Sequence, residues 1–239
     1  MILFPAIDVR NGNCVRLVQG DYDKETIYGD SPTDMGLEWE RKGAEYIHLI
    51  DLDGAKTGRS INREAIQAVA KAVNIPVQVG GGIRSMEIID EHIENGVSRV
   101  IIGTAAIQNP QFVKEAIDKY GEKIAVSIDA RNGYVATDGW TETSEVRALD
   151  LLKDLEAVGL QTVVYTDIFT DGMLQGPNFK ELKEINEQAS IDVIASGGVT
   201  TAEDVNKLRE MNMYGAIIGK ALYDGNLKLE DVLDGQANE

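Results

Sequence analysis

Several residue types are scarce in this sequence of 239 residues, and each scarcity excludes a class of protein. The single cysteine, Cys14, excludes an intramolecular disulfide and fits a reducing cytosol. With only two histidines, the chain has no cluster with metal-ligand spacing, so we expect no metal site. No apolar run approaches the roughly 20 residues that span a bilayer, and the start of the chain, Met1–Pro5, does not resemble a signal peptide. We therefore expect a cytoplasmic protein without a membrane partner.

Basic residues are also in deficit. The chain has 23 Lys and Arg against 40 Asp and Glu, which gives a formal net charge of −17. This balance argues against a nucleic-acid partner, because nucleic-acid binding relies on Lys and Arg that neutralise phosphates. If the ligand is an anion, helix N-termini and a few well-placed cations must hold it locally against the overall charge.

Aromatic residues make up only 6% of a chain that is 43% hydrophobic, so aliphatic side chains dominate, as in parallel strands buried on both faces. Short β-branched runs alternate with amphipathic stretches from end to end. The predicted strands lie at Leu3–Asp8, Tyr46–Asp51, Val77–Gly80, Arg99–Gly103, Ile124–Asp129, Thr162–Thr166, Asp192–Ser196 and Ala216–Gly219. The clearest predicted helices are Arg63–Val73, Met86–Asn95, Pro110–Tyr120, Ala148–Val158 and Ala202–Met211. This alternation predicts an α/β fold, a (β/α)₈ TIM barrel, with a doubly wound open sheet as the competing fold.

An internal repeat favours the barrel over the open sheet. The segment Ile7–Gly12 recurs as Ile128–Gly133, with five of six residues identical. Three further pairs share one offset of 116 residues: Leu49–Asp51 with Tyr165–Asp167, Gly81–Gly82 with Gly197–Gly198, and Ile101–Gly103 with Ile217–Gly219. A constant offset across separate strands indicates two duplicated half-barrels. We therefore expect residues 1–239 to form one domain, in which strands 1 and 5 face each other; its polar tail, from about Gly225, should be a final, frayed helix.

Asp8 and Asp129 each end an apolar predicted strand. In a parallel barrel the carboxyl ends of the strands form the active face, so the repeat puts both carboxylates in one mouth, on opposite walls. The simpler alternative is that each aspartate caps a turn with the Asn-Gly that follows it. Two acids related by a repeat favour catalysis, with one ionised as a base and the other protonated as an acid.

Glycine pairs that link strands to helices are a second signal. At such turns backbone N–H groups can close on an anion at a helix N-terminus, although glycine can also serve a tight turn alone. The first predicted cradle consists of Gly81, Gly82, Arg84, Gly103 and Thr104. The second consists of Ser196, Gly197, Gly198, Gly219 and Lys220, and Thr200 with Glu203 is predicted to cap the helix that follows Gly198. Two cradles on opposite walls predict a bisphosphate ligand that the carboxylates act on in its middle.

Residues in the loops after the first and fifth predicted strands are weaker candidates. Arg16 could clamp a phosphate or keep Asp8 ionised, and it could equally be a solvated arginine. Gly20 ends the same loop. Trp140 could stack on a heterocycle or be partly buried within its own loop.

The last candidate residues lie at and beyond the end of the sixth predicted strand, and the two histidines are considered with them. Thr166 ends that strand, and Asp171 beyond it is a rival for the acid role, although Asp-Gly usually marks a turn. His48, inside an apolar strand, is predicted to be a satisfied core histidine. His92, in the middle of a helix, is predicted to be solvated.

Taken together, these motifs resemble the HisA family, the phosphoribosylformimino-aminoimidazole carboxamide ribotide (ProFAR) isomerases of histidine biosynthesis. The resemblance extends over nearly the whole chain. It rests on Pro5–Asp8, Val15–Tyr22, His48–Ala55, Val79–Ser85, Ser127–Asp129, Asp138–Trp140, Tyr165–Gly172 and Ser196–Gly198.

The resemblance implies a cofactor-free Amadori rearrangement, in which an aminoaldose becomes an aminoketose within a substrate that carries two phosphates. By match to the family, Asp8 would be the base and Asp129 the acid, with Asp171 as a possible donor. We expect the protein to be a monomer whose partner is this small molecule.

Three alternatives remain open at this point. Some members of the family also isomerise phosphoribosylanthranilate. The sister cyclase subunit of imidazole glycerol phosphate synthase has the same duplicated barrel, but it usually carries Cys-Leu-Asp at the first strand, where this chain has Ala6-Ile7-Asp8. A non-catalytic phosphate-binding barrel would keep the glycine cradles without needing paired carboxylates.

Overall fold

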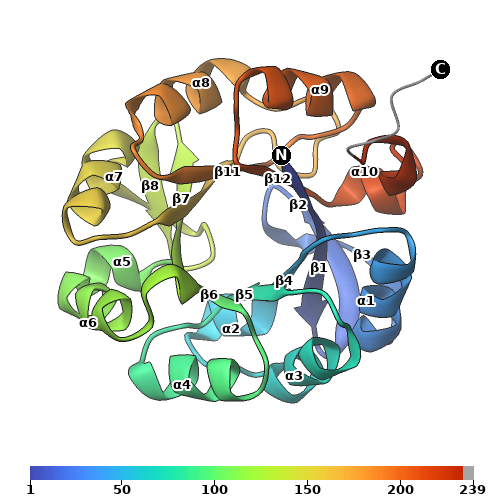
Figure 1. The fold of residues 1–239 in the computed structure, drawn as a ribbon, viewed down its shortest axis with the longest axis horizontal. Coiled ribbons are helices and arrows are strands. Elements are labelled where there is room, and N and C mark those ends of the chain that lie inside the picture. The colour runs from blue at the N-terminus through green and yellow to red at the C-terminus, as the bar shows by residue number, and fades with distance from the viewer. Residues whose placement is uncertain (234–239) are drawn as a thin grey trace.

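The computed structural model describes residues 1–233, which form a closed parallel barrel inside a ring of helices (Figure 1). Within these residues the barrel has eight strands: β1 (Ile2–Arg10), β4 (Ile47–Asp51), β5 (Val77–Gly80), β6 (Arg99–Ile102), β7 (Ile124–Arg131), β10 (Thr162–Asp167), β11 (Asp192–Ser196) and β12 (Gly215–Ile218). The predicted TIM barrel is confirmed, and each predicted strand overlaps one of these eight.

The order of the strands around the barrel decides which residues face one another. β1 pairs with β4 on one side and with β12 on the other, and the ring continues through β5, β6, β7, β10 and β11. β7 is therefore four strands from β1 in either direction. The opposite placement of the strands that carry Asp8 and Asp129 is confirmed, as is that of β5 opposite β11 and of β6 opposite β12.

The helices follow their strands in the order that a βα repeat requires. They are α1 (Pro32–Arg41), α2 (Leu52–Thr57), α3 (Arg63–Ala72), α4 (Met86–Glu94), α5 (Ala105–Gln108), α6 (Pro110–Tyr120), α7 (Ala148–Ala157), α8 (Phe179–Gln188), α9 (Ala202–Glu210) and α10 (Lys220–Tyr223). Two short 3₁₀ turns, Gly121–Lys123 and Leu229–Asp231, complete the set. None of the described helices is long and apolar enough to cross a membrane.

Two predictions about the helices differ from the structure: the cap of α9 and the helix at the end of the chain. The capping box of α9 is formed by Thr201 and Asp204, not by Thr200 and Glu203. The Asp204 carboxylate accepts hydrogen bonds from the backbone N–H groups of both Thr200 and Thr201, which fixes the helix start one residue later. In place of the predicted final helix from Gly225, the described part of the tail forms only the 3₁₀ turn, and residues 234–239 lie outside the described residues.

Two antiparallel hairpins interrupt the regular βα repeat, and both were predicted as loops. β2 (Asn13–Val18) and β3 (Asp21–Gly29) follow β1, and β8 (Tyr134–Thr137) and β9 (Glu142–Arg147) follow β7. In each case the barrel strand continues beyond its terminal aspartate and turns back through the Asn-Gly pair to begin the hairpin. The hairpins rise from opposite walls beside Asp8 and Asp129, so each catalytic candidate has a hairpin next to it.

The repeat is also visible in matching contacts of the two halves. Asn62 donates a hydrogen bond to the carboxylate of Asp51 at 2.8 Å, and Asn178 donates one to the carboxylate of Asp167 at the same distance. The two pairs are related by the offset of 116 residues found in the sequence. This agreement supports the proposed duplication, and it shows how each half fixes the loop that follows its second strand.

His92 on α4 is buried, with 1% of its surface exposed, so the prediction that it is solvated is wrong. Neither ring nitrogen has a hydrogen-bond partner among the described residues. Burial lowers the pKa of this imidazole below its usual 6.5. A neutral ring with two unpaired nitrogens in the protein interior destabilises the fold, because those groups lose water without gaining another partner.

We expect His92→Leu to stabilise the protein by about 1 kcal/mol at neutral pH, because the unpaired polar atoms are removed. The gain should be larger at pH 5.5 than at pH 8. Since the pKa is lower in the folded state, the unfolded chain binds the proton more readily, and the wild type loses stability as the pH falls below about 6.5. Thermal denaturation at both pH values measures this difference, and a lower melting temperature at both would contradict it.

Candidate active site

All the candidate residues from both halves line a single cavity at the carboxyl end of the barrel strands. The cavity includes Asp8 and Asp129, the glycine loops after β5 and β11, and the loops after β6 and β12. The structure therefore brings together residues that are up to about two hundred positions apart in the sequence. The barrel mouth is the usual position of the active site in this fold.

Asp8 lies in a buried ion pair with Arg16, which comes from strand β2 of the first hairpin. The Arg16 Nη1 atom is 2.8 Å from Asp8 Oδ2, and both side chains are about one-tenth exposed. Asp171, from the loop after β10, is 4.0 Å from the other Arg16 nitrogen. The alternative of a solvated Arg16 is therefore wrong, and its guanidinium lies close to the carboxylates of both Asp8 and Asp171.

Asp129 has no such cation in contact with it among the described residues. The polar side chains of Trp140 and Thr166 instead lower the pKa of its carboxyl group. Trp140 lies in the turn of the second hairpin, and its backbone has a φ of 71°, in the left-handed region. Its indole ring packs against Gly20 of the first hairpin, where a side chain would overlap it. Gly20 and Trp140 thus bring the two hairpins into contact across the cavity.

The three carboxylates differ in electrostatic environment although all have raised pKa values. Burial raises the pKa of Asp8 to about 6, with Arg16 lowering it and the charge of Asp171 raising it. Burial also raises the pKa of Asp129, the polar side chains of Trp140 and Thr166 lower it, and the charge of Asp171 raises it. For Asp171, burial raises the pKa and Arg16 lowers it. Such a group of carboxylates can divide the roles of base and acid near neutral pH.

The glycine loops after β5 and β11 need glycine for both conformation and space. Gly81 and Gly197 have φ values of 98° and 94°. A side chain at Gly81 would overlap the backbone of Asp51, and one at Gly197 would come within 2.9 Å of the carbonyl oxygen of Asp167. These loops pack directly on the preceding strand, which leaves their backbone on the cavity wall. The tight-turn interpretation is therefore confirmed for these residues, and the anion-cradle interpretation stays a prediction.

The two cradles have different neighbours in the structure. In the second, the Arg16 guanidinium lies against Gly219, where any side chain would collide with it. In the first, Thr104 accepts a hydrogen bond from the Asp138 N–H at 2.9 Å, and Arg84 is 3.2 Å from the Asp138 carboxylate. Each cradle therefore has an arginine at its edge, one buried and one half-exposed.

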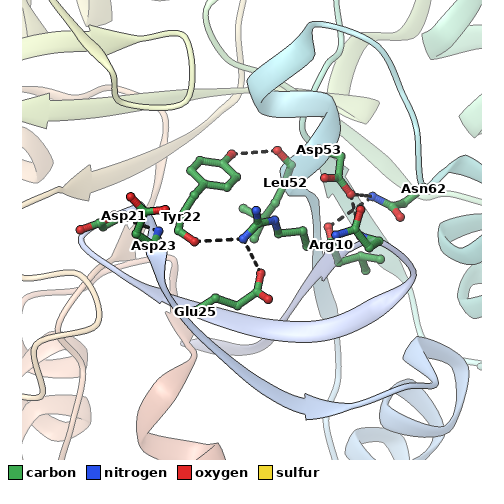
Figure 2. A network of polar contacts seen from close by, with 10 residues as sticks. Arg10, Asp21, Tyr22, Asp23, Glu25, Leu52, Asp53 and Asn62 are labelled. Atoms are coloured by element: carbon green, nitrogen blue, oxygen red, sulfur yellow. Dashed lines mark hydrogen bonds and ion pairs between the residues drawn. The ribbon is translucent and has the colours of Figure 1, made fainter.

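A network of polar contacts anchors the first hairpin to the start of helix α2 (Figure 2). Arg10 forms an ion pair with Glu25 at 2.7 Å and donates to the carbonyl oxygen of Tyr22, whose hydroxyl donates to the carbonyl oxygen of Leu52. Arg131, which corresponds to Arg10 in the repeat, likewise donates a hydrogen bond to a carbonyl oxygen in the second hairpin, that of Trp140. Equivalent arginines thus hold an aromatic residue of each hairpin at the cavity.

Tyr22, His48 and Ser127 line the cavity but were not among the sequence candidates for the site. His48 is buried and hydrogen-bonded, as predicted for a core histidine, yet the core it occupies is the floor of the cavity. The signal that could have found Ser127 is the strand alternation, because it lies two residues before Asp129 and points to the same face. Tyr22 lay in a segment predicted to be a loop, where alternation gives no information.

Among residues 1–233, no group of three or more His, Cys, Asp or Glu side chains is arranged to hold a metal ion. The groups available at the cavity are the carboxylates, the cations Arg16, Arg84 and Lys220, the hydroxyl groups, the imidazole of His48 and the backbone N–H groups of the glycine loops.

Comparisons with known proteins agree with this geometry. The family model described as "Histidine biosynthesis protein" matches residues 2–228. An Oceanobacillus iheyensis protein is 61% identical over 236 residues, which cover 99% of this chain and 98% of the relative. Proteins of Alkaliphilus metalliredigens and Bacillus pumilus are each 52% identical, over 96% and 98% of this chain and 97% and 96% of their own lengths. All three relatives are named 1-(5-phosphoribosyl)-5-((5-phosphoribosylamino)methylideneamino) imidazole-4-carboxamide isomerase. The chain therefore belongs to the histidine biosynthesis protein family, in the HisA branch that its sequence motifs resemble.

Proposed function

We propose that this protein is the ProFAR isomerase of histidine biosynthesis, which converts the aminoaldose ProFAR into the corresponding aminoketose by an Amadori rearrangement. The observation that carries the proposal is one cavity with carboxylates on opposite walls and a glycine cradle on each side. A substrate with a phosphate at each end fits this arrangement, because the two cradles hold the ends and leave the ribose between the carboxylates. The relatives named as this isomerase match nearly the whole length of the chain.

In the first step the ribose ring opens. The acid, which we assign to Asp129, protonates the ring oxygen, while the lone pair of the glycosylamine nitrogen forms the C1′=N bond and the C1′–O bond breaks. Burial without a contacting cation raises the pKa of Asp129, which favours the protonated form that this step needs. The substrate supplies the electron pair, so no cofactor is required.

In the second step the base, which we assign to Asp8, removes the C2′ proton. The C–H electron pair forms a C1′=C2′ bond and the iminium nitrogen recovers its lone pair, which gives an enolamine. Transfer of the enol proton to C1′ then produces the ketone at C2′. The Arg16 guanidinium at 2.8 Å favours the ionised form of Asp8, which is the form that can accept a proton.

A spectroscopic isomerase assay with purified protein and ProFAR tests the function. We expect turnover to the aminoketose that is unchanged by metal chelators. Parallel assays with phosphoribosylanthranilate and for ammonia-dependent ring closure test the alternatives of a broader isomerase and of the sister cyclase. Absence of ProFAR turnover, or turnover only in the cyclase assay, would refute the proposal.

The ion pair with Arg16 predicts the pH dependence of catalysis. If Asp8 must be ionised, kcat/KM should fall on the acidic side with a midpoint near pH 6, the pKa of Asp8. Arg16→Met should move this midpoint to higher pH, because the guanidinium that lowers the Asp8 pKa is lost. Arg16→Lys retains the charge and should keep the midpoint closer to pH 6. A midpoint that is the same in all three proteins would contradict the assignment of Asp8 as the titrating base.

Three further expectations accompany the proposed function. We propose that residues 1–239 form one domain, that the protein is a monomer and that it acts in the cytoplasm. Size-exclusion chromatography with light scattering measures the oligomeric state, and a mass twice that of one chain would contradict the monomer.

A further inference from the structure

A chain of three polar side chains passes through the floor of the barrel below the carboxylates. His48 on β4, Gln78 on β5 and Arg99 on β6 occupy neighbouring positions in the register of the sheet. The His48 Nδ1 atom is 2.9 Å from Gln78 Nε2, and Gln78 Oε1 is 2.7 Å and 3.0 Å from two nitrogens of Arg99. All three residues are buried, with at most 7% of their surface exposed.

These three side chains connect the cavity to the opposite end of the barrel. His48 lines the cavity, whereas Arg99 does not. The Arg99 guanidinium is 5.1 Å from the centre of the Tyr46 ring and 5.8 Å from that of Phe4, and it also donates to Thr162 at 3.4 Å. Arg99 is therefore held from several sides, in a position where it acts on the cavity only through Gln78 and His48.

The hydrogen-bond donors and acceptors of His48, Gln78 and Arg99 can be arranged in only one way. Arginine carries donors alone, so the Gln78 atom that faces Arg99 must be the carbonyl oxygen. The Gln78 amide nitrogen then faces His48 and donates to Nδ1, which must accept. A neutral imidazole has one N–H, so the proton of His48 lies on Nε2. This assignment follows from the chemistry of arginine, which donates hydrogen bonds and accepts none.

Electrostatics keep the imidazole neutral. Burial, together with the charges of Arg16 and Arg99, lowers the pKa of His48 to about 3. His48 therefore neither takes a proton from the carboxylates nor supplies one to them near neutral pH. With Nδ1 engaged by Gln78, the Nε2–H edge is the polar part of the ring left for the cavity. A neutral imidazole in such a place can polarise or position a substrate oxygen without titrating.

We propose that Arg99, through Gln78, fixes His48 as its Nε2–H tautomer, so that the cavity floor presents a neutral N–H donor to a ribose oxygen of the substrate. In this arrangement His48 contacts the substrate, and Gln78 and Arg99 are positioning residues. The proposal rests on the proposed isomerase function for the identity of the substrate, but the state of the tautomer can be measured without any substrate.

The first test is a two-bond ¹H–¹⁵N correlation spectrum of the ¹⁵N-labelled protein, which distinguishes the two neutral tautomers and the imidazolium. The chain has only two histidines, and His92→Leu removes the second set of signals. We expect a neutral Nε2–H ring for His48 at pH 7. A neutral Nδ1–H ring or an imidazolium would overturn the proposal.

The second test replaces the hydrogen-bond donor of Gln78 by an acceptor. Gln78→Glu is nearly isosteric, but its carboxylate can only accept, so the His48 proton should move to Nδ1. At a pH where the spectrum shows a neutral ring, we expect kcat/KM for ProFAR to fall about 10-fold to 100-fold, because the substrate loses a preorganised donor. Gln111→Glu makes the same charge change on the exposed face of α6 and should behave as wild type.

Variants of Arg99 separate positioning from simple stability. Arg99→Met should leave Gln78 free to turn, which yields a mixture of tautomers and a lower kcat/KM, and Arg99→Lys should restore the Nε2–H ring and much of the activity. Lower melting temperatures with unchanged tautomer and unchanged kcat/KM would show a merely structural role and overturn the proposal. If Gln78→Glu does not fold, the wild-type spectrum and the Arg99 pair still decide the question.

These outcomes are distinguishable from a failure of the proposed function. A wild-type protein that does not turn over ProFAR refutes the isomerase, whatever the spectrum shows. A wild-type protein that turns over ProFAR, with full activity retained in Gln78→Glu after its tautomer has changed, refutes only the role of His48.

Discussion

Replacing Asp8 by Asn is expected to lower kcat on the order of 10³-fold to 10⁴-fold while the barrel remains folded. The upper part of the range for general acid–base catalysis applies, because the asparagine amide cannot accept the C2′ proton at all. The side chain keeps its size, and its amide oxygen can still accept a hydrogen bond from Arg16, which lies 2.8 Å from the carboxylate in the wild type. We expect KM to change little, because Asp8 faces the ribose and the phosphates are held elsewhere.

A matched control separates catalysis from the loss of a charge. Asp154 lies on the exposed face of helix α7, so Asp154→Asn removes the same charge away from the cavity. This control should keep wild-type kcat. Circular dichroism and thermal denaturation check that both variants fold. If Asp8→Asn kept a tenth or more of the wild-type kcat, Asp8 could not be the base.

The parts of the site that could be predicted from the sequence are those fixed by the repeat. Asp8 and Asp129, and the glycine pairs at Gly81 and Gly197, lie at strand ends, and in a parallel barrel all strand ends open into one mouth. Once the repeat gave the order of the strands, opposite walls followed without any side-chain detail. For this reason every candidate residue lines the same cavity in the structure.

The contacts that tune these residues could not be predicted in the same way. The ion pair of Arg16 with Asp8 depends on a β-hairpin whose register contains bulges, so no simple alternation marks which side chains turn inward. Trp140, whose side chain lowers the pKa of Asp129, has a left-handed backbone conformation that sequence patterns do not predict for tryptophan. His92 was predicted at the surface because charged residues flank it, whereas the helix turns its ring towards the interior.

The position of His48 illustrates a different limit. An apolar strand correctly predicts that this histidine is buried, yet in a barrel the interior includes the floor of the active site. Burial alone therefore does not separate a core residue from a site residue. The distinction comes from the layer in which the side chain lies, and it needs the register between β4, β5 and β6.

The assignment of the acid leads to the second large effect. We expect Asp129→Asn to lower kcat about 10²-fold to 10³-fold, because ring opening loses its proton donor while the glycosylamine nitrogen still supplies the electron pair. The basic side of the pH profile, where the acid loses its proton, should disappear in this variant. Asp171→Asn should have a smaller effect, since Asp171 lies near Arg16, whose charge lowers its pKa and favours its ionised form.

The pH profile of Asp171→Asn distinguishes the two aspartates further. The charge of Asp171 raises the pKa values of both Asp8 and Asp129, so its removal should shift both sides of the profile to lower pH. A protonated Asp171 acting as the acid would have the opposite signature: its variant would lose the basic side, and Asp129→Asn would remain active. Because burial raises the pKa of Asp129 and no cation contacts it among the described residues, we expect the first of these results. The main difference between the base, Asp8, and the acid, Asp129, is then that Arg16 contacts only Asp8.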